Sequence, residues 1–477
     1  MIPLFSNPPA DASSVPPELA ARIAELGRGI ERLSAEHARI ADLAGLNNAT
    51  HPQSWIAVFN GYVGVLIVAF LVTLLTTPIM RRLALRNGVI DHPSDPRKVH
   101  RVPIAYLGGV AVYLGIMAGI LLSYLGVNEP TIVRFHDTLP QAPLGMLDNR
   151  FVPPWILLGL TVIMVIGLID DVSGISPRVK IGGQLLAAAA LAYGDFGVKV
   201  AQGVLAPTLG NLLHNPSLIY TLDLGFNAPL LGHTVEIDFI YWTGTAVIAV
   251  FVLGACNASN LIDGLDGLLS GVTAIATIGL LAISILVAFT DPGPRDAQRI
   301  ILCMALLGAC LGFLPHNFNP ATIFLGDCGS LLLGYSTIVI ILSLGDTGRT
   351  DLVIAGLIVY AIPILDTFLA IIRRKMAGKS MSDADSDHLH HMLKRAFGVK
   401  GAVFVMYGMG LVFAIIGVLL AASGARFVYS LALLCAAFIM VYSMKIARGK
   451  QLEQQSMESA APPPTHETET EQESVAV

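Results

Sequence analysis

The chain of 477 residues is 54% hydrophobic and only 13% charged, and its mean hydropathy is +0.69. Soluble domains contain about 45–50% apolar residues, so this composition excludes an ordinary soluble protein and indicates one that lies largely in lipid. The net charge of −5 says little by itself, because membrane topology follows the placement of Lys and Arg rather than their sum. We expect no nucleic-acid partner.

The first 55 residues are mixed polar sequence without the basic start and early apolar run of a secretory signal. Within this extracytoplasmic segment, residues 16–46 repeat apolar side chains alternately four and three positions apart, from Leu19 to Ala44, which is heptad spacing. Two interpretations stay open. The predicted helix lies on the membrane surface or on the protein's own loops, or it forms a contact in a homodimer.

Eleven apolar stretches are long enough, or nearly so, to cross a hydrocarbon core of about 30 Å. The predicted spans are residues 56–80, 104–125, 152–170, 180–195, 239–256, 268–290, 300–315, 330–344, 352–372, 402–422 and 427–446. The sequence therefore predicts an all-α polytopic membrane domain over residues 56–446. The cysteines at 256, 303, 310, 328 and 435 lie in or beside these spans, where packing is expected rather than a disulfide or a metal site.

The placement of basic residues predicts the orientation. With the N-terminus outside and the C-terminus inside, eighteen Lys and Arg residues fall in inner segments and eleven in outer ones. Cytoplasmic loops carry an excess of Lys and Arg, so this orientation is favoured. The outer connection at 196–238 alternates apolar and polar residues around Gly, Asn and Pro, which predicts a small β-hairpin. Residues 447–477 are rich in Glu, Thr, Pro and Ser and predict a disordered cytoplasmic tail.

The polar clusters with chemical character all fall in loops that this orientation places on the cytoplasmic side. They are DHPSDPRKVHRVPIAYLGG (91–109), LIDDVSGISPRVK (168–180), NASNLIDGLDGLLSG (257–271), NFNPATIFLGDCGS (317–330) and RRKMAGKSMSDADSDHLHHML (373–393). Five carboxylates at this boundary are Asp170, Asp171, Asp263, Asp266 and Asp327. Carboxylates there are costly unless something compensates them, and the loops at 257–271 and 317–330 contain no Lys or Arg.

Clustered oxygen ligands suit a hard cation. Mg²⁺ is commonly held by one or two carboxylates together with substrate phosphates, so we expect Mg²⁺, with Mn²⁺ as a substitute, and a phosphorylated substrate. The glycines beside these acids, such as Gly264, would let backbone N–H groups approach a phosphate closely. Candidates to neutralise a diphosphate or an anionic lipid head are Lys98, Arg101, Arg373 and Arg374. Ordinary positive-inside topology also accounts for such residues.

The run HLHH places His388 and His391 one helical turn apart. Such a pair can bind a transition metal, but the sequence offers no nearby cysteine partner and the surroundings are rich in oxygen ligands. We expect His388, His390 and His391 to donate to a phosphate instead, because imidazoles offer N–H groups and the loop starts with two arginines. A solvated loop without a chemical role is the alternative.

Together these motifs resemble the polyprenyl-phosphate N-acetylhexosamine-1-phosphate transferase family over about residues 56–446. The patterns DxPxxxRKxHxxPIxxxGG, the Asp-Asp pair, NxxNxxDGxDGL, FxGDxGS and HxHH occur in the family's order. HLHHML looks like the branch that uses UDP-N-acetylglucosamine or related donors, whereas the phospho-MurNAc-pentapeptide translocases have a His triplet followed by Phe-Glu. The translocase is therefore the second interpretation.

The resemblance implies that the protein transfers a HexNAc-1-phosphate from a UDP-sugar to polyprenyl phosphate and releases UMP, at the cytoplasmic face of a bacterial inner membrane. It implies that Asp327, with Asp171, holds Mg²⁺ and that Phe324 lies near the uracil. Residues implied to shape the nucleotide and diphosphate site are Asn257, Asn260, Asp263, Gly264, Leu265, Asp266 and Asn317. Those implied to face the lipid phosphate are Asp170, Asp171 and Lys98, and those implied to contact the sugar phosphate are His388, His390 and His391.

The expected chemistry is a direct displacement. A phosphate monoester is largely a dianion at neutral pH, so a strong general base is not essential, and Asp170 would orient the attacking lipid phosphate. A covalent phospho-aspartate route stays open. A secondary transporter is the alternative from another class, but transporter sites lie near the membrane midplane, whereas these acids collect at one edge and Asp366 is the exception.

Overall fold

The computed structural model describes residues 54–91, 103–127, 129, 131–136, 150–228, 232–376, 388–423 and 427. The predicted helix at 16–46, Lys98 and Arg101, the predicted span at 427–446 with Cys435, and the tail at 447–477 lie outside these residues, apart from residue 427 itself. For those segments the sequence predictions stay predictions.

The described chain is mostly helical, as predicted. Its helices are α2 (Trp55–Asn87), α3 (Gly108–Gly126), α4 (Pro154–Ser173), α5 (Pro177–Tyr193), η1 (Val198–Ala201), α6 (Gln202–Leu205), η2 (Ala206–Gly210), α7 (Phe239–Ile262), α8 (Leu268–Thr290), α9 (Asp296–Asn317), α10 (Gly326–Ser343), α11 (Thr350–Val359), α12 (Ala361–Met376) and α13 (Leu389–Ala421). Eight of them are long and apolar enough to cross a membrane, or up to ten spans if each of two bent pairs counts as one.

Two of the predicted spans, at 180–195 and 352–372, coincide with pairs of helices that meet at a sharp bend. Helix α5 and the helical residues at 198–210 meet at 83°, and α11 and α12 meet at 82°. Each bend follows a short break in the helix, at residues 194–197 and at Tyr360. A break in a buried helix leaves backbone groups to satisfy, so such bends are found where neighbouring protein or a cavity supplies partners.

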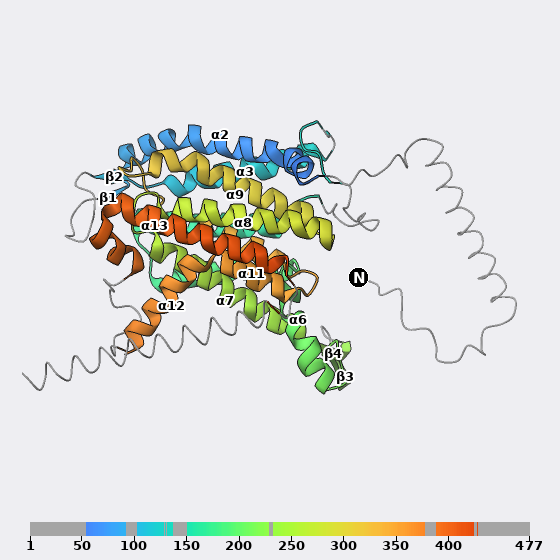
Figure 1. Cartoon of the computed structure of the whole chain (residues 1–477). Coiled ribbons are helices and arrows are strands. Elements are labelled where there is room, and N and C mark those ends of the chain that lie inside the picture. The colour runs from blue at the N-terminus through green and yellow to red at the C-terminus, as the bar shows by residue number, and fades with distance from the viewer. Residues whose placement is uncertain are drawn as a thin grey trace, which may run out of the picture. The chain divides into compact units, whose positions relative to one another are not determined.

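The core lies between α8, α9 and α10. In an 18-residue apolar stretch of α8, α9 and α10, 72%, 89% and 89% is buried inside the protein, against 22% for the corresponding stretch of α2. Helix α2 packs on α3 and α9, and α13 packs on α8 and α11 (Figure 1). Helix α10 packs on α4 and α7. The outer helices expose large apolar side chains such as Leu75, Val250 and Leu419, which is the expected surface of a protein that faces lipid.

Two small sheets mark opposite ends of the helices (Figure 1). Strands β1 (Ile90–Asp91) and β2 (Ile104–Ala105) pair antiparallel, and Ala105 also forms a parallel bridge with Ile323. Strands β3 (Ile219–Ala228) and β4 (Gly232–Asp238) form an antiparallel hairpin in which Ile219 is opposite Asp238. The hairpin expected in the 196–238 connection is therefore present in the structure.

The described cysteines agree with the packing role expected from the sequence. Cys256, Cys303, Cys310 and Cys328 are all buried and free. Among the residues that the structure describes, they form no disulfide and no metal knuckle.

Candidate active site

The loops that carry the acidic motifs meet at one end of the helices, and Asp171 joins two of them. This residue lies in the last turn of α4, and its two carboxylate oxygens accept hydrogen bonds from the backbone N–H groups of Asp327 (2.7 Å) and Cys328 (3.0 Å). Those donors belong to the first turn of α10, where a carboxylate stabilises unpaired N–H groups and the helix dipole. Asp171 therefore fixes the position of Asp327.

Glycines make this junction possible. Gly326 has a positive φ of +69°, and a Cβ at that position would lie 2.4 Å from Oδ2 of Asp171. Gly109, at the start of α3, approaches α10 so closely that a Cβ would lie 2.1 Å from the backbone nitrogen of Gly329. The FxGDxGS and PIxxxGG motifs therefore pack directly against each other.

Asp327 is surrounded by polar groups from three other helices. Lys180 of α5 forms ion pairs with both Asp327 and Asp170. Asn260 of α7 donates from Nδ2 to Oδ1 of Asp327 (2.8 Å) and to Oγ of Ser330 (3.0 Å). Helices α4, α5, α7 and α10 therefore contribute two carboxylates, one ammonium and one amide that are linked by direct contacts.

Asp263 contributes a carboxylate that has no partner among the residues that the structure describes. It follows the last residue of α7, and no hydrogen bond or ion pair reaches its side chain from the part of the chain that the structure describes. Burial, together with the negative charges of Asp327, Asp171 and Asp266, raises the pKa of Asp263 to about 8. A carboxylate crowded by other carboxylates is stabilised in its charged form by a bound cation, so this donor set fits a divalent metal.

Asp266 and Asn317 hold the loops beside the acidic cluster together. Oδ2 of Asp266 accepts from Nδ2 of Asn319 (2.9 Å) and from the backbone N–H of Ala321 (3.0 Å). Asn317 is buried, and its Oδ1 accepts from the backbone N–H of Gly267 (3.2 Å) and from Oγ of Ser270 (2.9 Å). These contacts join the α7–α8 loop to the α9–α10 loop, which gives both residues a bracing role.

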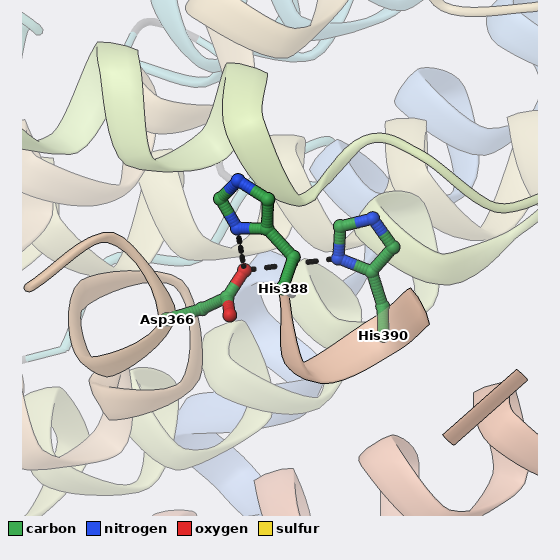
Figure 2. Close-up of side chains that lie close together, drawn as sticks. All are labelled: Asp366, His388 and His390. Atoms are coloured by element: carbon green, nitrogen blue, oxygen red, sulfur yellow. Dashed lines mark hydrogen bonds and ion pairs between the residues drawn. The ribbon is translucent and has the colours of Figure 1, made fainter. Parts of the chain in front are cut away.

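The histidines reach the same loop from α13. His388 precedes the first residue of α13, and its Nδ1 lies 2.9 Å from Oδ2 of Asp366 in α12 (Figure 2). The His390 ring lies against Gly264, since a Cβ there would be 2.5 Å from Nε2 of His390. The ring centroids of His390 and His391 are 4.2 Å apart. The HLHH run is therefore beside the DGLDG loop, which is residues 263–267.

The structure brings some predicted residues less directly to this centre. Asn257 donates to Oε1 of Gln184 (3.0 Å) in α5 rather than to an acidic residue. Phe324 is half-buried, with its ring centroid 6.2 Å from that of Tyr106, and Leu265 is buried. Arg373 and Arg374 lie in the last turn of α12. The substrate contacts predicted for these residues stay predictions.

Two residues in the site were missed as candidates from the sequence. Lys180 lies in the LIDDVSGISPRVK motif, and its position one helix after the Asp-Asp pair was the available signal. In the sequence, Asp366 is a charge inside the predicted span at 352–372. A carboxylate in such a position is a functional candidate by default, and the structure shows it bonded to the histidine motif.

Comparisons with known proteins fit this arrangement. The sequence model of glycosyl transferase family 4 matches residues 154–345. A probable undecaprenyl-phosphate N-acetylglucosaminyl 1-phosphate transferase of Bacillus subtilis is 32% identical over 366 residues, which are 74% of this chain and 85% of that protein. The chain belongs to glycosyl transferase family 4. The resemblance seen in the motifs is therefore confirmed.

Further relatives have names of two kinds. A decaprenyl-phosphate N-acetylglucosaminephosphotransferase of Mycolicibacterium smegmatis is 31% identical over 72% of this chain and 77% of its own length. A phospho-N-acetylmuramoyl-pentapeptide-transferase of Geobacillus kaustophilus is 29% identical over 74% of this chain and 95% of its own length. The family 4 match includes all five clustered carboxylates from Asp170 to Asp327, whereas Asp366 and the histidines follow it in the chain.

Proposed function

We propose that this protein transfers GlcNAc-1-phosphate from UDP-GlcNAc to a polyprenyl phosphate and releases UMP, with Mg²⁺ as its cofactor. The observation that carries the proposal is the contact of Asp170, Lys180 and Asp327 at one end of the helices. Relatives of about 32% identity that cover most of the chain are named for the same transfer. Family membership and these names favour the transferase over a transporter.

The reaction exchanges one phosphoanhydride for another. An oxygen of the lipid phosphate forms a bond to the phosphorus that carries the sugar, and the bond from that phosphorus to the bridging oxygen of UMP breaks, so that UMP leaves with the electron pair. Little bond energy changes in total. The protein must chiefly hold two anions in line and stabilise the negative charge that spreads over the transferred phosphoryl group.

The residues of the site divide these tasks. Lys180 supplies a fixed positive charge between Asp170 and Asp327, where it can attract a phosphate. Asp170 is held in place by the backbone N–H of Ile175 (2.8 Å) and orients the attacking lipid phosphate. Asp327 and Asp263 are the residues that would hold Mg²⁺. When bound, Mg²⁺ supplies positive charge that polarises phosphate oxygens.

Asp171 and Asp266 act mainly by positioning other groups. Both oxygens of Asp171 accept backbone N–H groups of α10, and Asp266 accepts from the α9–α10 loop. The direct metal contact predicted for Asp171 stays a prediction, because each oxygen has a further lone pair. Substitution of Asp171 or Asp266 would displace Asp327 or the DGLDG loop. It would not remove a group that contacts the transferred phosphate.

The proposed location is a bacterial inner membrane with the acidic end toward the cytoplasm. The excess of Lys and Arg in the segments assigned to that side supports this orientation. The β3–β4 hairpin, at the other end of the helices (Figure 1), would then face outward. The acceptor is a polyprenyl phosphate, undecaprenyl or decaprenyl as in the names of the relatives, and the product begins a cell-envelope polysaccharide such as a teichoic acid or a lipopolysaccharide.

The test uses purified full-length protein in detergent with UDP-GlcNAc and undecaprenyl phosphate. We expect UMP release that requires both the lipid and Mg²⁺, and that stops when EDTA is added. Asp327→Asn keeps the shape of the side chain but removes its charge, so we expect at least about a 100-fold loss of kcat. Asp291→Asn, at an exposed ion pair far from the acidic loops, is the matched control and should retain activity.

Parallel reactions with UDP-GalNAc and with UDP-MurNAc-pentapeptide identify the donor. Faster turnover of the pentapeptide substrate than of UDP-GlcNAc would favour the translocase interpretation. Mg²⁺-dependent turnover that survives in Asp327→Asn would refute the ligand assignment, and lipid-dependent UMP release unaffected by EDTA would refute the metal requirement.

A further inference from the structure

The carboxylate of Asp366 is buried in a helix and belongs to none of the acidic loops. It is 2% exposed and lies in α12, just after the 82° bend from α11. Its partners, among the residues that the structure describes, are the His388 and His390 side chains and the backbone N–H of Leu389. A buried carboxylate is costly unless its oxygens accept hydrogen bonds. These three partners therefore indicate which groups Asp366 positions.

Each oxygen of Asp366 has its own task. Oδ1 accepts the backbone N–H of Leu389 (2.8 Å), the first residue of α13, and Oδ2 lies 2.9 Å from Nδ1 of His388 (Figure 2). An ionised carboxylate can only accept, so Nδ1 of His388 must donate. This bond fixes the ring orientation and leaves Nε2 as the only ring nitrogen available to a substrate.

The same contacts connect the histidines to the acidic cluster. The rings of His388 and His390 are nearly parallel, with centroids 5.5 Å apart. Nδ1 of His390 lies 3.7 Å from Oδ2 of Asp366, and its Nε2 faces Gly264 in the loop between Asp263 and Asp266. A rotation of His388 would disturb the stacked His390 and its contact with that loop.

We propose that Asp366 is a positioning residue, which holds His388 and the start of α13 so that the histidine motif meets the sugar phosphate during transfer. This inference rests on the proposed transferase function. Asp366 acts through His388: it ties the motif to α12, fixes which ring nitrogen carries the proton, and keeps the rings beside the DGLDG loop.

A metal ion is the rival use of the same three side chains. Three potential ligand atoms, one from each of Asp366, His388 and His390, lie within 4.8 Å of one another. Two ligands of a tetrahedral zinc with bonds of about 2.0–2.1 Å would be roughly 3.3 Å apart. The 2.9 Å between Oδ2 of Asp366 and Nδ1 of His388 is shorter and is an ordinary N–H···O distance. The geometry therefore favours the direct hydrogen bond.

The experiment is a double-mutant cycle on kcat with purified full-length protein. We expect Asp366→Asn to lower kcat about tenfold to a hundredfold, as loss of an outer partner that orients a functional histidine does, with KM for UDP-GlcNAc changed by less than about twofold. Asp366→Asn combined with His388→Gln should be no slower than His388→Gln alone, because both changes remove the same interaction between Asp366 and His388. Asp366→Asn combined with His391→Gln, the matched control, should multiply the two losses.

A conservative variant separates positioning from packing. Asp366→Glu keeps acceptor oxygens, so it should retain more of kcat than Asp366→Asn, and it serves as the test if Asp366→Asn does not fold. The reverse ranking, multiplicative losses for Asp366→Asn with His388→Gln, or an unchanged kcat in Asp366→Asn would overturn the proposal.

Metal analysis of the wild-type protein distinguishes the positioning role of Asp366 from a metal site. We expect substoichiometric zinc and other transition metals after purification. One tightly held equivalent that disappears in Asp366→Asn would replace the positioning role with a metal site. A wild-type protein that releases no UMP from UDP-GlcNAc would refute the proposed function itself, which is a result distinct from any ranking of the variants.

Discussion

At the scale of single residues, the site shows that similar carboxylates are used in different ways. Asp171 accepts two backbone N–H groups, Asp266 accepts an amide and a backbone N–H, and Asp327 contacts Lys180 and Asn260. Asp263 has none of these contacts among the described residues. The first two carboxylates brace the backbone of neighbouring loops, whereas Asp327 and Asp263 are the carboxylates proposed to hold a cation.

Lys180 gives the sharpest prediction at this scale. Lys180→Gln leaves Asp170 and Asp327 facing each other without a cation, so we expect kcat/KM to fall about 100-fold, measured as UMP release. Lys180→Arg keeps the charge but changes the shape of the donor, and it should retain part of the activity. The control is Arg178→Gln, an exposed cation two residues earlier in α5, which should have nearly normal activity. Equal activity in the two glutamine variants would contradict the role of Lys180.

At the scale of elements, the site is built where helices end. The last turn of α4 meets the first turn of α10, and the end of α7 is followed by the DGLDG loop. Helix ends leave backbone N–H groups unpaired, and side chains from neighbouring elements pair with them. The Asp171 contact with α10 and the Asp366 contact with α13 are two examples. Positions of side chains in the site therefore depend on how closely the helices approach.

Gly326 tests that dependence. Gly326→Ala forces a left-handed backbone onto a residue with a Cβ, which costs about 1–2 kcal/mol, and it places that Cβ 2.4 Å from Asp171. We expect a lower free energy of unfolding and loss of activity, measured by thermal unfolding in detergent and by UMP release. Gly254→Ala in α7 is the control, because nothing lies within 4 Å of its Cβ and alanine favours a helix. An unchanged Tm in Gly326→Ala would show that the contact between Gly326 and Asp171 tolerates a side chain.

At the scale of the whole molecule, charged groups gather at two ends of the helices. One end has the acidic loops and Lys180. At the other end, Arg295 pairs with Asp346 and stacks over Phe196, and Arg349 pairs with Asp291 and Asp351. Between them the helices are apolar, as a membrane interior requires. The two ends are then expected to face different compartments.

Cysteine labelling tests this orientation. In a variant with Cys435→Ser, a single new cysteine replaces the exposed Ser173 beside the acidic loops or the exposed Ser217 before the hairpin. A membrane-impermeant maleimide should label Ser217→Cys in intact cells and Ser173→Cys only after permeabilisation. The described native cysteines are buried and should give little background. The opposite labelling pattern would place the acidic end outside and contradict the proposed location.

Much of the fold followed from local patterns. Ten predicted spans overlap described helices, and the hairpin lies where alternation predicted it. The largest difference in a predicted boundary is at α13, which begins at Leu389 rather than at residue 402. The bends after α5 and between α11 and α12 were not predicted, because hydropathy marks a span but not a bend within it. For the site, the motifs identified Asp170, Asn260 and Asp327, but not Lys180, since its basic charge was equally consistent with positive-inside topology.

Hydropathy and motif spacing are properties of neighbouring residues, and they were enough to predict a membrane protein, the course of most of its helices and the loops proposed to carry the chemistry. Which groups touch depends instead on the packing of segments that are far apart in the chain. Asp171 and Asp327 are 156 residues apart in the chain, and Lys180 and Asp327 are 147 apart. Only the packing of α4, α5, α7 and α10 brings them together, and no local pattern encodes that distance.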